Sequence, residues 1–154
     1  MRPGAVLAAV LVLAACRIEN RAPAGSLRDD EAIRGVVTSY YRVVGAAEWP
    51  SVHSLFAVGA TIQQGPAEGG GWRTFDSPEE YSAWLELRAR TPLEPVRVEP
   101  RQDGNFATVW VATRRAGATR GSAGSDHFQL RRIDDAWRII SFVSVTAVPQ
   151  PGTQ

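Results

Sequence analysis

The chain has 154 residues, of which 44% are hydrophobic and 21% are charged, a balance typical of one globular domain. Its 17 basic side chains are all arginine, and removal of residues 1–15 takes away Arg2 and leaves 16 against 16 acidic side chains. A mature chain with balanced charge has no polybasic surface, so nucleic acid is not an expected partner.

Residues 1–15 have the pattern of an export signal. A positive start at Arg2 is followed by an apolar run over residues 5–13 and by the small residues Ala14 and Ala15, which a signal peptidase requires before its cut. The apolar run is shorter than the roughly 20 residues that span a bilayer. We therefore predict a cleaved signal peptide over residues 1–15.

The segment Leu13-Ala14-Ala15-Cys16 resembles the bacterial lipobox, in which the cysteine is lipidated and becomes the new N-terminus. Cys16 is the only cysteine of the chain, and an unpaired thiol in an exported protein invites oxidation. The alternative is an ordinary signal peptide with a chance cysteine. We expect a lipoprotein of the cell envelope, held on a membrane through Cys16 and a flexible tether over residues 16–26. Because Arg17 follows the cysteine, the outer membrane is expected if the source has two membranes.

Three helices are predicted in the first part of the domain, over residues 27–46, 49–56 and 77–90. The third begins with Ser77 as N-cap, Pro at the first helical position and Glu80 at the third. The first carries an apolar stripe at helical spacing, formed by Ile33, Val36, Val37, Tyr40, Tyr41 and Val44.

The rest of the domain reads as strands. Alternating apolar and polar residues predict strands at 60–64, 72–75, 96–101, 106–115, 126–133 and 136–148. Three helices before a meander of long antiparallel strands indicate an α+β fold. The predicted domain covers residues 27–148, and residues 149–154 are expected to form a disordered tail.

Several segments together resemble one known group of domains. They are Asp30 to Val44 with Glu48-Trp49, Leu55 to Ile62, Pro78 to Leu85, and Phe128 to Arg132 before Ala136-Trp137-Arg138-Ile139. In order and spacing they resemble the SnoaL-like branch of the nuclear transport factor 2-like superfamily. This resemblance implies a cone-shaped domain, in which a curved sheet wraps a long helix and leaves a pocket at the open end. Members include isomerases, dehydratases, hydrolases and non-catalytic modules, so the fold does not define the function.

The resemblance to the ketosteroid isomerase members selects candidate pocket residues. Tyr40 matches their tyrosine on the first helix, Gln64 falls where they carry the carboxylate base, and Gln129 falls where they carry a second oxyanion donor. An amide cannot abstract a proton at neutral pH, so the catalytic base is missing at this position. The expected ligand-binding residues are Tyr40, Gln64 and Gln129, with Trp84 at the pocket rim or, alternatively, in the core.

The two histidines offer little catalytic potential. His53 on the second helix has no partner at metal-ligand spacing and is expected to face solvent or cap a helix. His127 is the better general-base candidate, but adjacent strand residues point to opposite faces, so it cannot form a dyad with Asp126. The sequence predicts no metal site and no cofactor.

The predicted sheet has an apolar face and a mixed face. Pairing across the Gly/Ser-rich turn puts Val109, Val111, Phe128 and Leu130 on the apolar face, and Trp110, His127, Gln129, Ile140 and Phe142 on the mixed one. The resemblance would turn the mixed face toward the pocket, whereas hydrophobic patterning would give it to an oligomer interface. We favour the interface, because a continuous apolar face normally packs on helices.

Three functions remain open at this stage. The leading hypothesis is a non-catalytic, membrane-tethered domain that binds a small, partly apolar molecule or a protein partner in its cone. The first alternative is an isomerase, dehydratase or hydrolase that uses Tyr40 and His127. The second is a homodimeric assembly module whose pocket is filled by its own side chains.

Overall fold

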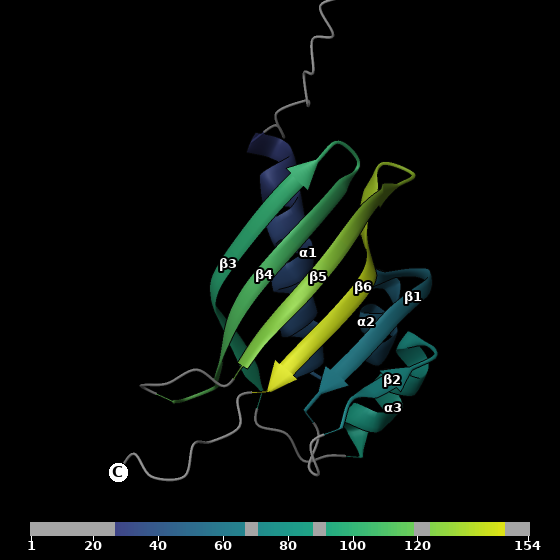
Figure 1. Cartoon of the computed structure of the whole chain (residues 1–154), viewed down its shortest axis with the longest axis vertical. Coiled ribbons are helices and arrows are strands. Elements are labelled where there is room, and N and C mark those ends of the chain that lie inside the picture. Colours follow the sequence, from purple (N-terminus) through teal and green to yellow (C-terminus); the bar gives the residue numbers. More distant parts are fainter. Residues whose placement is uncertain (1–26, 67–70, 88–91, 119–123, 147–154) are drawn as a thin grey trace, which may run out of the picture.

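The computed structural model describes residues 27–66, 71–87, 92–118 and 124–146. The predicted signal peptide, Cys16, the tether and the predicted tail lie outside the described residues. The described part forms one curved sheet of six strands with three helices against one of its faces (Figure 1). The predicted α+β class and the cone-shaped arrangement are confirmed.

The helices are α1 (Leu27–Gly45), α2 (Trp49–Leu55) and α3 (Pro78–Glu86). The stripe predicted for α1 is its core-facing side: Ile33 and Val37 have no exposed surface, and Tyr40 and Tyr41 are buried. Helix α3 ends at Glu86, four residues earlier than predicted, although the residues that follow Leu87 are not described up to position 91.

The start of α3 has the capping arrangement that its sequence predicts. The side chain of Ser77 accepts a hydrogen bond from the backbone N–H of Glu80, with a nitrogen–oxygen distance of 3.2 Å. The carboxylate of Glu80 in turn accepts one from the backbone N–H of Asp76 at 2.8 Å. Two backbone donors that the helix itself cannot satisfy are thereby paired.

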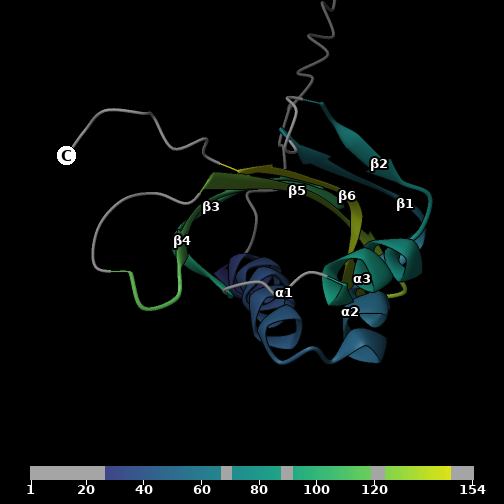
Figure 2. The same ribbon diagram turned by 90° about the horizontal axis from the view of Figure 1, so that it is seen from below.

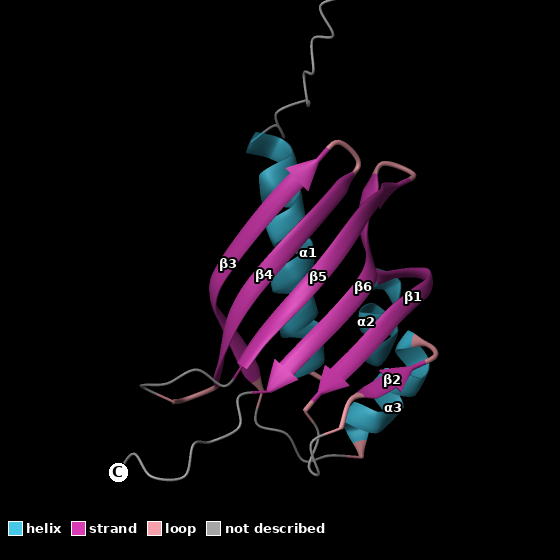
Figure 3. Cartoon of the chain, viewed as in Figure 1, coloured by secondary structure: helices cyan, strands magenta, loops and turns pink. Residues whose placement is uncertain are grey.

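The strands are β1 (Phe56–Gly65), β2 (Arg73–Phe75), β3 (Leu93–Asp103), β4 (Phe106–Arg115), β5 (Gly124–Ile133) and β6 (Ala136–Thr146). Their order across the sheet is β2-β1-β6-β5-β4-β3, and all neighbours are antiparallel except β1 and β6 (Figure 3). Strand β3 begins before the predicted start at Val96 and includes Pro95 and Pro100. Proline is tolerated there because β3 is an edge strand.

All three helices cover the concave face of the sheet (Figure 2). The core between the two layers contains the predicted apolar set of β4 and β5, because Val109, Val111, Phe128 and Leu130 are almost completely buried. The opposite, convex face carries no helix among the described residues. None of the described helices combines the length and apolar character required to cross a membrane.

Strand β6 contains a bulge. Gln129 of β5 pairs with Ser141, but its neighbour Leu130 pairs with Ile139, so Ile140 is an extra residue without a partner in this register. A bulge of this kind resets the alternation of side chains along its strand.

The bulge corrects one prediction about the sheet faces. Trp137 and Ile139 are buried before it, and Phe142 and Ser144 are buried after it. The assignment of Phe142 to the mixed face together with Ile140 is therefore wrong, because it assumed unbroken alternation. Phe142 lies in the core and is 1% exposed.

Replacing Ser77 with alanine should lower the free energy of unfolding by about 1 kcal/mol, because the N-cap acceptor of α3 is lost. Chemical denaturation of the purified protein would measure the change. Ser54→Ala is the matched control, since the Ser54 hydroxyl is exposed and caps no helix start. Equal stability of Ser77→Ala and the wild type would show that the cap does not contribute.

Candidate ligand-binding site

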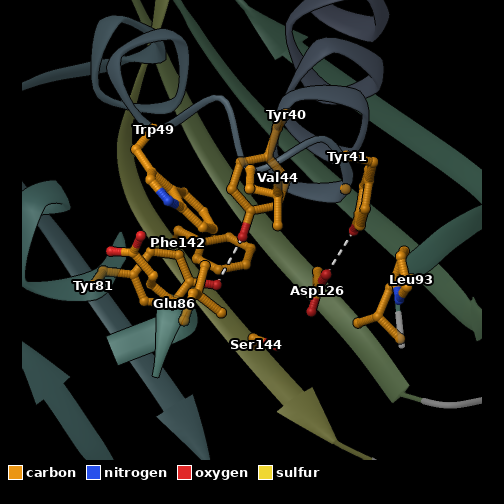
Figure 4. A pocket seen from close by; sticks show the side chains of 14 residues that line it. Tyr40, Tyr41, Val44, Trp49, Tyr81, Glu86, Leu93, Asp126, Phe142 and Ser144 are labelled. Carbon is orange, nitrogen blue, oxygen red and sulfur yellow. Dashed lines mark hydrogen bonds between the residues drawn. The ribbon is translucent and has the colours of Figure 1, made fainter. Parts of the chain in front are cut away.

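A cavity of about 270 Å³ opens between the C-terminal half of α1, the start of α2, helix α3 and strands β5 and β6 (Figure 4). This volume lies just below the roughly 300 to 1,000 Å³ of typical ligand pockets. Five aromatic side chains line the cavity: Tyr40, Tyr41, Trp49, Tyr81 and Phe142. The cavity is thus mainly aromatic, and its polar groups lie at defined positions on the wall.

Tyr40 and Tyr81 form the first polar pair of the wall. Their hydroxyl oxygens, from α1 and α3, lie 2.8 Å apart and share a hydrogen bond in which either can donate. Burial, followed by the effect of Tyr81, raises the pKa of Tyr40 well above its usual value of 10.0. The bond holds two hydroxyl groups from different helices side by side on the cavity wall.

Tyr41 and Asp126 form the second polar pair. The Tyr41 hydroxyl donates to Oδ2 of Asp126 at 2.6 Å, and this bond joins α1 to β5 in the interior (Figure 4). Asp126 is 2% exposed. Burial, reinforced by the adjacent carboxylate, raises the pKa of Tyr41 far above its usual value. Tyr41 therefore stays protonated and acts as a permanent donor to the carboxylate.

Two further polar residues belong to the cavity. Ser144 on β6 lies directly opposite Asp126 in the strand register and is buried. Glu86, at the end of α3, is exposed and contributes to the rim. Among the described lining residues there are two carboxylates and no basic side chain.

Asp126 was not among the predicted site residues. The information was present in the sequence, because Asp126 has the same alternation phase as Phe128 and Leu130, which were assigned to the packed face. Tyr41 was likewise part of the predicted buried stripe without being selected. Their contact is a tertiary one, and no local spacing indicates it.

Tyr40 is the one predicted ligand-binding residue that lines this cavity. Trp84 is buried but belongs to the core, where its ring stacks on Tyr81 with centroids 6.1 Å apart and contacts Phe75 at 5.1 Å. Its placement at the pocket rim is therefore corrected in favour of the core alternative.

Gln64 is not among the described residues that line the cavity. It is half-buried on β1, where it pairs with Arg73 of β2 and Ser144 of β6. Gln64 has the same alternation phase as the buried Ile62, and its neighbour Ser144 in the β1–β6 register lines the cavity. Gln64 as a ligand-binding residue therefore stays a prediction.

Gln129 and His127 lie on the convex face. Both are exposed and, with Trp110, border a separate hollow of about 280 Å³ between β3, β4 and β5. The predicted placement of Gln129 inside the cone is therefore wrong, because the sheet separates its two faces. For the same reason, Tyr40 and His127 cannot share one active site. The mixed face, which we predicted to form an oligomer interface, is the convex face of the sheet. A homodimer stays a prediction.

His53 links two helices. Its Nε2 lies 2.8 Å from the Ser82 hydroxyl, and its Nδ1 lies 3.8 Å from the carboxylate of Glu79. Ser82 uses its own hydrogen toward the backbone carbonyl of Glu79, so Nε2 is the donor in the first contact. Ser82 itself is buried. In the described segments, no group of three or more His, Cys, Asp and Glu side chains could hold a metal ion.

No protein-family model and no curated protein sequence matches the chain. Solved structures do match. An NTF2-like protein of unknown function from Methylobacillus flagellatus has a TM-score of 0.65 and 18% identity, over 80% of this chain and 95% of its own. One from Shewanella baltica has a TM-score of 0.62 and 16% identity, over 80% and 97% of the two chains.

A third similar structure is that of a protein of unknown function with a cystatin-like fold from Nostoc punctiforme. Its TM-score is 0.63 at 16% identity, over 82% of this chain and 96% of its own. The chain thus has the cone-shaped fold of NTF2-like and cystatin-like domains, and it covers nearly the whole of each of them. At such identities the likeness defines the fold alone.

The raised pKa values of Tyr40 and Tyr41 predict how the stability of the folded domain changes at alkaline pH. Because the folded state holds the protons of Tyr40 and Tyr41, the stability that they contribute is fully present below pH 10.0 and is lost as the pH rises above it. The chain has three tyrosines, so at least two should stay un-ionised until the protein unfolds.

Ultraviolet absorbance of tyrosinate and circular dichroism, recorded together from neutral to alkaline pH, would test this. The tyrosinate signal of these residues should rise in step with unfolding. Full ionisation of all three tyrosines around pH 10.0 in a folded protein would contradict the buried geometry.

Proposed function

We propose that this domain binds a small, partly apolar molecule in its cone and that a lipid on Cys16 attaches it to a membrane of the cell envelope. The observation that carries the first part is the convergence of two hydrogen-bonded pairs, Tyr40 with Tyr81 and Tyr41 with Asp126, on one aromatic cavity. A pocket with apolar walls and a few convergent polar groups is typical of a small-molecule site.

Filling the cavity tests the binding proposal. Ser144→Leu adds a larger side chain inside the cone, whereas Ser141→Leu is a matched control on the same strand, with its side chain on the other face. We expect phenethyl alcohol to shift the nuclear magnetic resonance signals of Tyr40 and Phe142 in the wild type. Ser144→Leu should abolish these shifts, and Ser141→Leu should retain them.

Two results would contradict the proposal. One is a set of shifts centred on the convex hollow around Trp110. The other is equal binding by Ser144→Leu and the wild type, since a filled cone cannot hold the ligand. Thermal melting of both variants would verify that each is folded.

The lipid anchor rests on the lipobox-like segment and on the lone cysteine. Mass spectrometry of the exported protein should find acyl chains on Cys16, and Cys16→Ser should be released in soluble form. Cell fractionation would identify the membrane. A soluble wild-type product without acylation, beginning at a residue other than Cys16, would refute the anchor.

An enzyme is the second candidate, and the buried carboxylate favours it. The non-catalytic hypothesis began from the absence of a carboxylate at Gln64 and Gln129, but Asp126 provides one inside the cavity. A carboxylate beside tyrosine donors is a combination that can move a proton to or from a bound molecule. An enzyme would chemically convert the molecule that it binds, and Asp126→Asn would abolish that turnover.

A further inference from the structure

A second hollow lies on the convex face of the sheet, on the side opposite the helices and the cone cavity (Figure 2). Its volume is about 280 Å³, and three adjacent strands, β3, β4 and β5, contribute its lining residues. Six of these residues share the convex side of the sheet: Glu99, Arg101, Thr108, Trp110, His127 and Gln129. The hollow is thus a space of its own, formed by strands alone.

The strand register arranges these six side chains in two rows of three. Trp110 lies directly between Glu99 and His127, and the neighbouring row is centred on Thr108. Adjacent strands are about 4.8 Å apart, and residues two apart on one strand are about 6.8 Å apart, so the rows cover roughly 10 by 7 Å. One or two sugar rings fit an area of this size.

The polar side chains around Trp110 combine hydrogen-bond donors and acceptors. The carboxylate of Glu99 accepts, the guanidinium of Arg101 donates, and the amide of Gln129 does both. All three are exposed. Because the lining includes an anion and a cation, a charged ligand would meet a like charge as well as an opposite one. The chemistry suits a neutral molecule with many hydroxyl groups, each of which donates and accepts.

Glu99 also forms an ion pair with Arg97, two residues away on β3. Both side chains are exposed, and ion pairs at exposed positions are weak. The pair therefore holds the carboxylate beside the hollow without excluding a hydroxyl group of a ligand from it.

Trp110 provides an apolar surface in the middle of its row. It is half-buried, so part of the side chain remains accessible from the hollow. The C–H groups on one face of a sugar ring are apolar and pack on an aromatic ring, while the hydroxyl groups at the edge of the sugar reach the polar side chains around it.

A second copy of the chain is the competing occupant of this face, and the composition of the hollow argues against it. The centres of protein interfaces are depleted in charged side chains. A dimer across the hollow would bury Glu99 and Arg101 of both copies, and removing such groups from water is costly. A small sugar leaves the outer sides of these groups hydrated.

From these observations we propose that the convex hollow binds a neutral saccharide of one or two pyranose rings. One ring packs on Trp110, and its hydroxyl groups form hydrogen bonds with the polar side chains of the two rows. The site is separate from the proposed cone site, because the sheet lies between them. Since the polar side chains lose water on binding, we expect a dissociation constant of about 0.1 to 10 mM.

Three neutral disaccharides test the site: cellobiose, maltose and N,N′-diacetylchitobiose. Nuclear magnetic resonance on the intact protein would follow each titration, through saturation transfer to the sugar and through the indole N–H signal of Trp110. We expect at least one of the three to bind, to receive saturation mainly at the C–H protons of one ring face, and to shift the Trp110 signal. The signals of Tyr40 and Phe142, in the cone, should not move.

Variants with matched controls test the two parts of the site. Trp110→Ala should weaken binding by at least about tenfold, because the packing surface is lost. Trp72→Ala is its control, since Trp72 is exposed and lies outside the hollow. Gln129→Ala should weaken binding about three- to tenfold through the loss of a hydrogen bond. Gln63→Ala should have no effect, because Gln63 is exposed on the same face of the sheet but on β1.

Several results would overturn the inference. They are binding of none of the three sugars up to about 50 mM, binding that folded Trp110→Ala leaves unchanged, and shifts at Tyr40 and Phe142 in place of Trp110. A dimer, detected by analytical ultracentrifugation, that Trp110→Ala separates into monomers would assign the hollow to a second copy. If Trp110→Ala does not fold, the wild-type shifts and the comparison of Gln129→Ala with Gln63→Ala decide the matter. The cone is tested separately with phenethyl alcohol, so the two proposals can fail independently.

Discussion

The inner face of the sheet must present large side chains to α1 along its whole length, and a single bulge in β6 makes this possible. The extra residue at Ile140 lets Ile139 face inward on one side of it and Phe142 on the other. With regular alternation, Ser141 would meet α1 and Phe142 would be turned to the convex face. Phe142 contacts the ring of Tyr40, so the bulge sets the core packing and one wall of the cavity together.

The cavity in turn depends on how the domain accommodates a buried carboxylate. Removing a charged group from water is costly unless hydrogen bonds replace its hydration. Tyr41 provides such a bond to Asp126, and burial, which raises the pKa of Tyr41, keeps its proton available for this bond at neutral pH. The preceding residue, Tyr40, forms a hydrogen bond with the hydroxyl of Tyr81 on α3. Two neighbouring tyrosines on one helix thus define the polar wall, one toward the sheet and one toward α3.

Much of this fold could be predicted from local patterns. Helical spacing identified the buried side of α1, the Ser77 cap identified the start of α3, and alternation separated Val109 and Phe128 from His127 and Gln129. The errors arose where a position depends on tertiary register. The bulge at Ile140 leaves no mark in the alternation of the apolar residues that precede it. The contact of Tyr41 with Asp126 joins residues 85 positions apart in the chain, which no local pattern indicates.

The geometry also relates the site to the proposed membrane anchor. The chain enters the domain at the start of α1, whereas Tyr40 and Tyr41 lie more than three turns further along this helix, about 20 Å away at 1.5 Å per residue. The cavity is lined by the last part of α1, by α2 and by the ends of α3 and β6, at the far end of the cone. The proposed tether would therefore join the domain at the end opposite the cavity, and the proposed anchor would leave the cavity open to a ligand from solvent.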